Sequence, residues 1–191
     1  MSPLMGWTAL IPFRTGTGGK SRLEAVLDAA TRERLAREMA QHVIDMLSRC
    51  PEIERIVVLS NKAFDHPAAT FAMDAGRGLN PEISAFRDDF GPAPLLVIHA
   101  DLPLLAQADV KGLLEAATEH GIAMATDRTG EGTNAIALAD GRKFVFRFGP
   151  GSRALHGAAE EQMPVLQRDG LSADLDTPDD LAFLRQRGLR V

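Results

Sequence analysis

Six short stretches of the chain are apolar with few interruptions, as buried β-strands are. They are residues 7–13, 55–60, 94–100, 122–126, 134–139 and 163–167. The second of them, RIVVLS, is rich in β-branched side chains, which pack well on a pleated surface. Because successive positions are apolar, rather than every second one, the pattern predicts strands covered on both faces, as in parallel sheets.

Between these stretches the spacing of apolar residues changes to that of helices. In residues 31–50, Leu35, Met39 and Val43 fall on one face of a helix, with charged residues opposite. Thr31 is expected to cap the start of this helix. Further helices are predicted at residues 108–120, after a turn in residues 147–161, and from Thr177-Pro178 onward.

Strands that alternate with helices predict an α/β domain with a mostly parallel sheet. At 191 residues the chain fits a single domain, residues 1–191. Residues 61–91 show neither period and are expected to be irregular. Ligands of such sheets bind beyond the carboxyl ends of the strands, so residues that follow strands are the candidates for a site.

Composition narrows the classes of function. The formal net charge is -5 and the Lys and Arg residues are scattered, without the basic face of a nucleic-acid-binding domain. The single cysteine, Cys50, excludes an internal disulfide and is expected to pack at a helix end. The longest apolar run, residues 94–106, is too short and interrupted to cross a bilayer, and no basic segment precedes the first apolar stretch. We therefore expect a cytoplasmic protein that binds neither nucleic acid nor a membrane.

A glycine-rich loop, RTGTGGKS, runs from Arg14 to Ser21 after the first predicted strand. The Walker A loop of ATPases and GTPases reads G-x-x-x-x-G-K-[ST], and Arg14 stands where its first glycine is required. The sequence therefore argues against a P-loop NTPase. Clustered glycines still let backbone N–H groups converge on an anion, and Lys20 and Arg22 add charge. The loop is a candidate phosphate site, and its alternative is a surface loop without a ligand.

Carboxylates stand at two further places. Asp101 directly follows a buried strand, and Asp174 and Asp176 are two residues apart, which puts both on one side of an extended segment. Mg²⁺ prefers oxygen ligands from carboxylates, phosphates and water. The three aspartates are therefore candidate Mg²⁺ ligands, with turn or helix capping as their alternative. Asp179 and Asp180 are assigned to the start of the last helix, where the helix dipole favours acidic groups.

Six segments in order resemble one family. They are IPFRTGTGGKSRL, GLN, HADLPLLAQADV, RTGEGTNAI, FRFGPGSRALH and GLSADLDTPDDL. Together they are similar to the 2-phospho-L-lactate guanylyltransferase (CofC-type) family of MobA-like nucleotidyltransferases, which serves biosynthesis of coenzyme F-420. The resemblance covers residues 7–184, and GTN, FGPGS and the D-x-D-T-P-x-D-L ending are its specific parts. It implies a three-layer αβα fold like that of the nucleotide-diphospho-sugar transferases.

The resemblance also implies a reaction. A GMP unit passes from GTP to the phosphate of 2-phospho-L-lactate, phosphoenolpyruvate or 3-phospho-D-glycerate, and pyrophosphate leaves. The attacking group would be a phosphate oxygen that is already anionic, so no general base is needed. Because two anionic reactants must meet, positive charge at the site matters most.

Site residues are carried over from the resemblance position by position. The catalytic residues would be Lys20, Asp101 and Asp176. The Mg²⁺ ligands would be Asp101, Asp174 and Asp176. The GTP phosphates would be bound by Gly16, Gly18, Gly19, Lys20, Ser21 and Arg22. The phospho-acid would be bound by Thr133, Gly149 and Ser152.

Several other residues are open at the level of sequence. His99 is expected to point away from Asp101 by strand alternation if the strand continues that far, and His156 to pack or to lie on the surface. Asn80 and Asn134 either contact the nucleotide or brace loops. Many relatives carry a lysine at the exit of the first strand, and Arg14 is expected to take over its charge.

Two alternative functions stay open. One is another nucleotidyltransferase of the same fold, with a molybdopterin or sugar-phosphate acceptor; the other is a non-catalytic GTP-binding domain. Apolar segments around Phe64, Phe71 and Phe86 would form either a homodimer surface or part of the core. Handover of the product to a downstream transferase is a further expectation from the resemblance.

Overall fold

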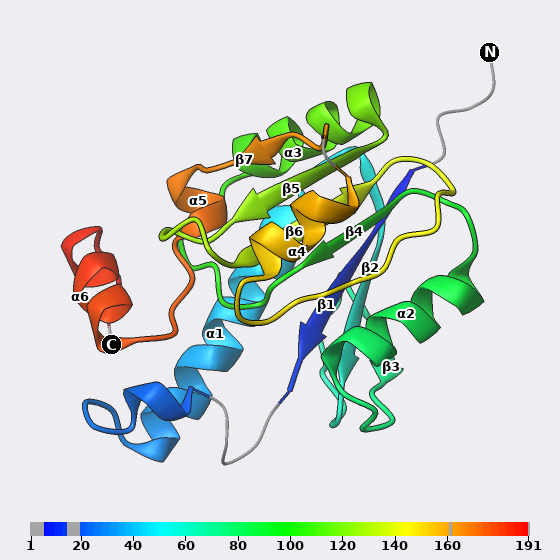
Figure 1. Ribbon diagram of the computed structural model, residues 1–191. Helices are drawn as coiled ribbons and strands as arrows, with labels where there is room; N and C mark the ends of the chain where they lie inside the picture. The colour runs from blue at the N-terminus through cyan, green and yellow to red at the C-terminus, as the bar shows by residue number, and fades with distance from the viewer. Residues whose placement is uncertain (1–5, 15–19, 161, 191) are drawn as a thin grey trace.

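The computed structural model describes residues 6–14, 20–160 and 162–190. Within them, one seven-stranded sheet forms the centre of the molecule (Figure 1). Its order is β3-β2-β1-β4-β6-β5-β7. The strands are β1 (Trp7–Phe13), β2 (Ile53–Ser60), β3 (Thr70–Met73), β4 (Leu95–Ile98), β5 (Ile122–Thr126), β6 (Thr133–Leu138) and β7 (Val165–Leu166). β6 pairs antiparallel with both β4 and β5, while the other pairs are parallel, so the predicted, mostly parallel sheet is confirmed.

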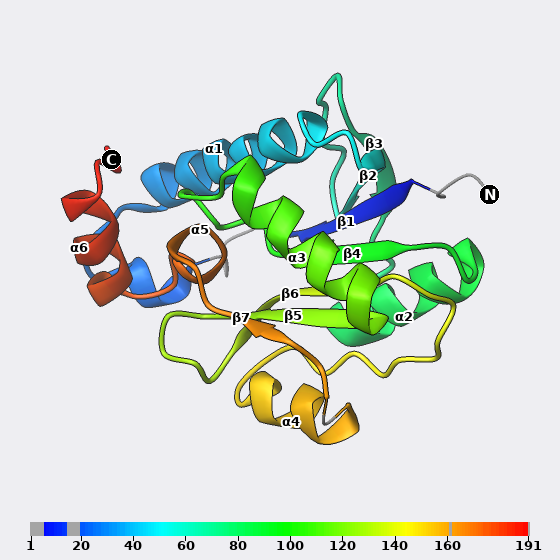
Figure 2. The same cartoon turned by 90° about the horizontal axis from the view of Figure 1, so that it is seen from above.

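Helices cover both faces of the sheet, as Figure 2 shows from above. α1 (Ala29–Ser48), α3 (Gln107–His120) and α5 (Asp169–Ser172) contribute to the core on one face. α2 (Leu79–Phe90) and α4 (Ser152–Ala159) lie on the other. α6 (Pro178–Gln186) packs beside the first half of α1. The three-layer αβα architecture is therefore confirmed.

Alternation along β1 explains the two cores. Ala9, Ile11 and Phe13 point to the side of α1 and α3, and Leu10 points to the side of α2. All four are buried, which is why the strand reads as continuously apolar. No helix among the described residues is long and apolar enough to cross a membrane.

Side chains cap the starts of α1 and α6. α6 begins as predicted at Thr177, whose hydroxyl accepts from the N–H of Asp180, while Asp180 accepts from the N–H of Thr177 at 2.9 Å. For α1 the prediction is wrong by one turn. Asp28 is the cap and accepts from the N–H of Thr31 at 2.7 Å, so Thr31 lies within the helix.

The expectation that residues 61–91 are irregular is also wrong, because β3 and α2 lie there. β3 is an edge strand whose Phe71 and Met73 are exposed, so it lacks an apolar run. α2 carries Pro81 in its first turn, where proline is tolerated, and it buries two charged residues, Glu82 and Arg87. Both elements therefore lack the patterns of apolar residues by which strands and helices are recognised in a sequence.

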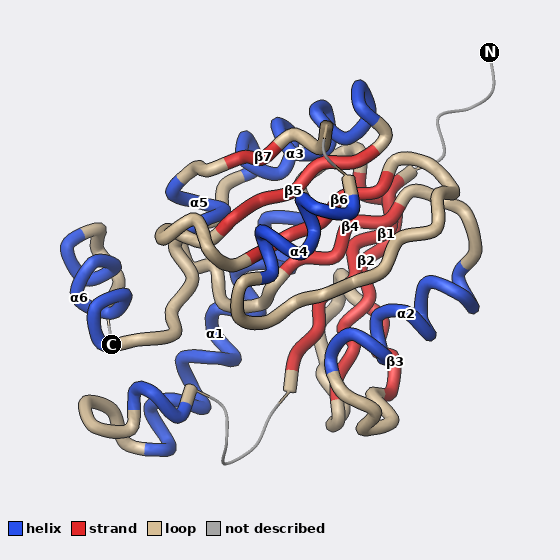
Figure 3. Tube along the Cα trace, viewed as in Figure 1, coloured by secondary structure: helices blue, strands red, loops and turns tan. Residues whose placement is uncertain are grey.

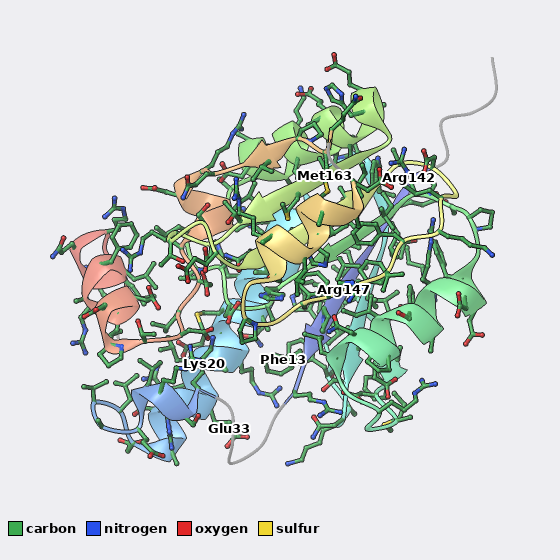
Figure 4. All side chains as sticks on the ribbon, viewed as in Figure 1. Phe13, Lys20, Glu33, Arg142, Arg147 and Met163 are labelled. Atoms are coloured by element: carbon green, nitrogen blue, oxygen red, sulfur yellow. The ribbon has the colours of Figure 1, made fainter. Side chains whose placement is uncertain are left out.

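Residues 140–148, here called the return segment, are needed because of the direction of β6. β6 runs antiparallel to β4, so it ends at the opposite end of the sheet from the carboxyl ends of β1 and β4. The chain must therefore run back along the sheet before α4 can start. Figure 3 shows this stretch as loop, and in Figure 4 Arg142 and Arg147 mark its two ends. Phe146 and Phe148 are buried, and their rings stack with centroids 6.2 Å apart, whereas Val145 is exposed.

Candidate active site

Polar residues from distant parts of the chain meet at one edge of the sheet. β1 and β4 end there, and β6 begins there. The N–H of Leu175 donates to the carbonyl of Asp101 at 3.2 Å, which holds residues 173–177 against the end of β4. This is the edge at which open α/β sheets bind ligands.

Lys20 lies between two of the predicted aspartates. Its ammonium donates to Asp101 Oδ2 and to Asp176 Oδ1, the latter at 2.8 Å, and its side chain is only 11% exposed. Lys20 is also the one non-glycine residue with positive φ, 57°, in the part of the chain that the structure describes. A left-handed conformation costs a side-chain-bearing residue about 1–2 kcal/mol, so the two ion pairs hold Lys20 in a strained position.

These ion pairs fix the charge of Lys20 and Asp101. Burial alone would lower the pKa of Lys20, but the charges of Asp101 and Asp176 outweigh burial and raise it. Burial would likewise raise the pKa of Asp101, and the charge of Lys20 reverses the sign and lowers it. Both groups are therefore charged at neutral pH.

Asp174 completes the cluster from the other side. Asn134, which is buried at the start of β6, donates from Nδ2 to Asp174 Oδ1 and to the carbonyl of Leu171, both at 3.0 Å. Burial and the charge of Asp101 raise the pKa of Asp174 to about 7, against the opposing effect of Asn134. The cluster therefore holds more carboxyl groups than the ammonium of Lys20 can neutralise.

The donor set fits a hard divalent cation. Its ligands would be carboxylate oxygens, which Mg²⁺ prefers, and Asp101 Oδ1 is buried without a hydrogen-bond partner within the described ranges. No three Asp, Glu, His or Cys side chains in those ranges are arranged as a ready metal site. The ammonium of Lys20 instead stands between Asp101 and Asp176, as an internal cation.

The residues assigned to the phospho-acid gather around the start of α4. Gly149 and Gly151 have φ of 128° and 67°, conformations that only glycine adopts without strain. This turn places Ser152 at the first position of α4, where it is 1% exposed and its hydroxyl is unpaired among the described residues. Such a hydroxyl suits a ligand that accepts a hydrogen bond, for example an anion.

Thr133 reaches the same region through His156. The backbone N–H of Arg147 donates to His156 Nε2 at 2.8 Å, so the neutral ring must carry its proton on Nδ1. Nδ1 then donates to Thr133 Oγ1 at 3.0 Å, and the Thr133 hydroxyl donates to the sulfur of Met124 at 3.3 Å. Sulfur is a weak acceptor, so the Thr133 hydroxyl can turn to a better one at little cost.

His99 lies between the aspartate cluster and the start of α4. The prediction that it points away from Asp101 required the strand to continue that far, and β4 ends at Ile98. Residues two apart in a strand would in any case lie on one side, and the charge of Asp101 acts on the ring. Burial lowers the pKa of His99 in spite of that charge. Its ring centroid is 5.2 Å from that of Phe148, and its Nε2 is buried and unpaired within the described residues.

The glycine loop is only partly within the described residues. Gly16, Gly18 and Gly19 lie outside them, whereas Ser21 and Arg22 are exposed in a 3₁₀ turn just after Lys20. Figure 4 shows Lys20 near Phe13, toward the end of the sheet where β1 terminates. Arg14 forms a two-bond ion pair with Asp74 at the end of β3, and this lowers the pKa of Asp74 to about 2.

The structure thus brings together Lys20 and all three aspartates at one edge. Thr133 precedes Asn134, which bonds Asp174, and Gly149 and Ser152 lie at the start of α4. Sequence reasoning missed the contribution of His99 and His156. Their signal was weak, since a histidine next to an apolar run is most often a packing residue. His156 is fully buried, and it acts on the site through residues 9 and 23 positions away in sequence.

Comparisons with known proteins show what the chain is similar to. Residues 7–188 match the family model described as "Guanylyl transferase CofC like". The chain is 36% identical over 193 residues to the phosphoenolpyruvate guanylyltransferase of Rubrobacter xylanophilus, covering 94% of each protein. It is 31% identical over 176 residues to the 2-phospho-L-lactate guanylyltransferase of Methanopyrus kandleri, covering 90% of this chain and 87% of the relative.

A solved structure shares the fold at lower identity. It comes from Desulfovibrio desulfuricans G20 and is described as a nucleotide-diphospho-sugar transferase. The TM-score is 0.70 at 18% identity, covering 95% of this chain and 87% of the other. At that identity the likeness concerns the fold alone.

Proposed function

The chain belongs to the CofC-like guanylyl transferase family, and from this premise we propose that it transfers GMP from GTP to the phosphate of a three-carbon phospho-acid. The observation that carries the proposal is a lysine paired with two aspartates at one sheet edge, together with a buried serine hydroxyl that has no partner among the described residues. The first part suits a nucleoside triphosphate, and the second suits a small anion.

The reaction needs positioning and charge rather than proton transfer. An oxygen of the acceptor phosphate attacks the α-phosphorus of GTP and forms a new P–O–P bond. The bond from the α-phosphorus to the oxygen that bridges to the β-phosphate breaks, and its electron pair leaves with pyrophosphate. Since the acceptor oxygen is already anionic, the lowered pKa values of His99 and His156, due first to burial in each, do not hinder the step.

Each residue has a defined task in this proposal. Lys20 would stabilise the charge that develops on pyrophosphate, together with Gly16, Gly18, Gly19, Ser21 and Arg22. Thr133, Gly149 and Ser152 would bind the phospho-acid. Asp101, Asp174 and Asp176 would hold Mg²⁺, which supplies positive charge to the phosphate oxygens when bound.

The acceptor is proposed to be phosphoenolpyruvate, 2-phospho-L-lactate or 3-phospho-D-glycerate, and the pathway that of coenzyme F-420. The first two acceptors are supported by the names of the relatives. Homodimer formation, handover to a downstream transferase and a cytoplasmic location stay predictions.

The test is pyrophosphate release by the purified protein with Mg²⁺ and GTP. Each of the three acceptors is added in a separate reaction, with ATP and CTP as controls for the base. Release with GTP and one acceptor is the expected result. Release with CTP in place of GTP would favour another nucleotidyltransferase of this fold, and GTP binding without release under any condition would favour a non-catalytic domain.

A further inference from the structure

Asn80 clamps the chain just before the proposed acceptor residues. Its side-chain Nδ2 donates to the carbonyl of Phe148 at 3.0 Å, and its Oδ1 accepts from the N–H of the same residue at 2.8 Å. Both polar atoms of the amide are thus directed at one backbone position. Asn80 is the second residue of α2, so the clamp joins the start of that helix to the return segment.

His156 holds the neighbouring residue from the other side. It accepts from the N–H of Arg147 at 2.8 Å and contacts Thr133 Oγ1 at 3.0 Å. Residues 147–148 belong to no strand, so these side-chain bonds replace the ladder that would otherwise fix them. Two consecutive backbone positions are thereby held by α2 and α4.

Phe148 stands directly before the turn that carries the acceptor residues, which gives the clamp its importance. Phe148 is 6% exposed, and its ring lies 5.2 Å from that of His99 and 5.3 Å from that of His156. The next residue, Gly149, starts the turn that ends at Ser152. A glycine-rich turn is conformationally free, so a fixed residue at its start limits where Ser152 can lie.

We propose that Asn80 and His156 are positioning residues that hold residues 147–148 so that Gly149 and Ser152 are in place before the phospho-acid binds. Such preorganisation lowers the entropic cost of ordering the turn when a ligand binds. The inference rests on the proposed function for the identity of the ligand. Of the two roles open to Asn80 from sequence, the geometry favours the bracing of a loop, since both polar atoms of its amide bond the backbone of Phe148.

Asn80→Ala tests the clamp directly. The KM for the acceptor should rise about tenfold, the effect of losing one or two hydrogen bonds, whereas the KM for GTP should not change. Asp88→Asn, an exposed position on the same helix, is the matched control and should leave both values unchanged. A rise in the KM for GTP instead would show that Asn80 reads the nucleotide and would overturn the proposal.

Asn80→Asp separates positioning from mere stability. The carboxylate can still accept from the N–H of Phe148, but it repels the carbonyl of that residue, and in the first turn of α2 it favours the helix. The acceptor KM should therefore rise while the melting temperature does not fall. An unchanged acceptor KM in both Asn80 variants would overturn the proposal.

His156 has its own conservative replacement. His156→Gln offers an oxygen to the N–H of Arg147 and an N–H to Thr133, so it should restore much of the acceptor affinity lost in His156→Ala. Equal acceptor KM values for the two variants would argue against positioning by His156.

Hydrogen exchange tests the clamp without turnover. In the free protein, the Phe148 amide should exchange faster in Asn80→Ala than in wild type or Asp88→Asn, and equal rates would overturn the clamp. Calorimetric binding of phosphoenolpyruvate, 2-phospho-L-lactate and 3-phospho-D-glycerate should weaken in the same variant. If wild type releases no pyrophosphate under any condition, the proposed function fails, while exchange and binding still decide whether Asn80 positions an anion site.

Discussion

The ammonium of Lys20 lies between two aspartates that are proposed to hold a metal ion. Lys20 is buried, it occupies a left-handed backbone conformation, and its ammonium contacts two carboxylates at once. Those same carboxylates are the proposed ligands of Mg²⁺. Under the proposed function, Mg²⁺ and the ammonium would compete for Asp101 and Asp176, and a phosphate of GTP would offer the ammonium another partner.

Replacing Lys20 by methionine should have two opposite effects. Pyrophosphate release should fall about 100- to 1,000-fold, as when one preorganised transition-state contact is removed. Mn²⁺, titrated calorimetrically into the nucleotide-free protein, should bind more tightly than to wild type, because the competing ammonium is gone. Lys111→Met, at an exposed position on α3, is the control, and equal or weaker Mn²⁺ binding by Lys20→Met would contradict the competition.

Asp101→Asn should abolish pyrophosphate release while the fold survives. Asparagine has the same shape, but its neutral amide is a poor ligand for Mg²⁺ and a weaker partner for Lys20. Circular dichroism checks the fold, and the pyrophosphate assay checks turnover. Activity close to that of wild type would rule out the metal assignment.

At the scale of elements, the start of α6 fixes the segment that carries two of the aspartates. Asp176 directly precedes the capping box of Thr177 and Asp180, and Asp174 lies two residues before Asp176. A stable helix start therefore serves the site as well as the helix.

Thr177→Ala should destabilise the protein by about 1 kcal/mol through loss of the cap. For a chain of this length that corresponds to a fall of about 2–4 °C in melting temperature. Thr177→Ser keeps the hydroxyl and should melt close to wild type in differential scanning calorimetry. Identical melting of the alanine and serine variants would show that the cap contributes nothing.

The sequence predicted the elements with strong patterns and missed those without them. The strands around Leu10, Val58 and Leu96 were predicted because both faces are buried. The edge strand β3 was not predicted, because its apolar residues are exposed. α2 was not predicted, because its buried face includes the charged residues Glu82 and Arg87.

The same contrast holds for the site. Asp101 could be found from sequence, because it follows a buried apolar run directly. The roles of Asn80 and His156 could not. Asn80 meets a residue 68 positions away, and that contact exists only because the return segment crosses back along the sheet.

At the scale of the whole molecule, stability should respond to the protonation of His156. Burial and the charge of Arg147 lower its pKa to about 4, against about 6.5 in an unfolded chain. Between these values the unfolded state binds a proton that the folded state does not. The contribution of neutral His156 is therefore complete above pH 6.5 and is lost as the pH falls toward 4, by at most about 3 kcal/mol.

Urea denaturation of wild type and His156→Gln at pH 7.5 and pH 4.5 measures this contribution. The free energy of unfolding of wild type relative to the variant should be smaller at the lower pH. Other titrating groups, Asp174 among them, are present in both proteins, so their effects cancel in the comparison. A difference that does not vary with pH would contradict a buried neutral ring.

The reversed direction of β6 has a consequence for how such a protein can evolve. The proposed nucleotide end of the site lies at β1 and β4, whose registers are fixed by neighbouring strands. The proposed acceptor end follows the return segment, whose exposed residues, such as Lys143 and Val145, lie outside any strand. Substitutions at these exposed positions do not alter the pairing of the strands. Selection for a new acceptor can therefore act on one end of the site while the machinery for the nucleotide is inherited unchanged.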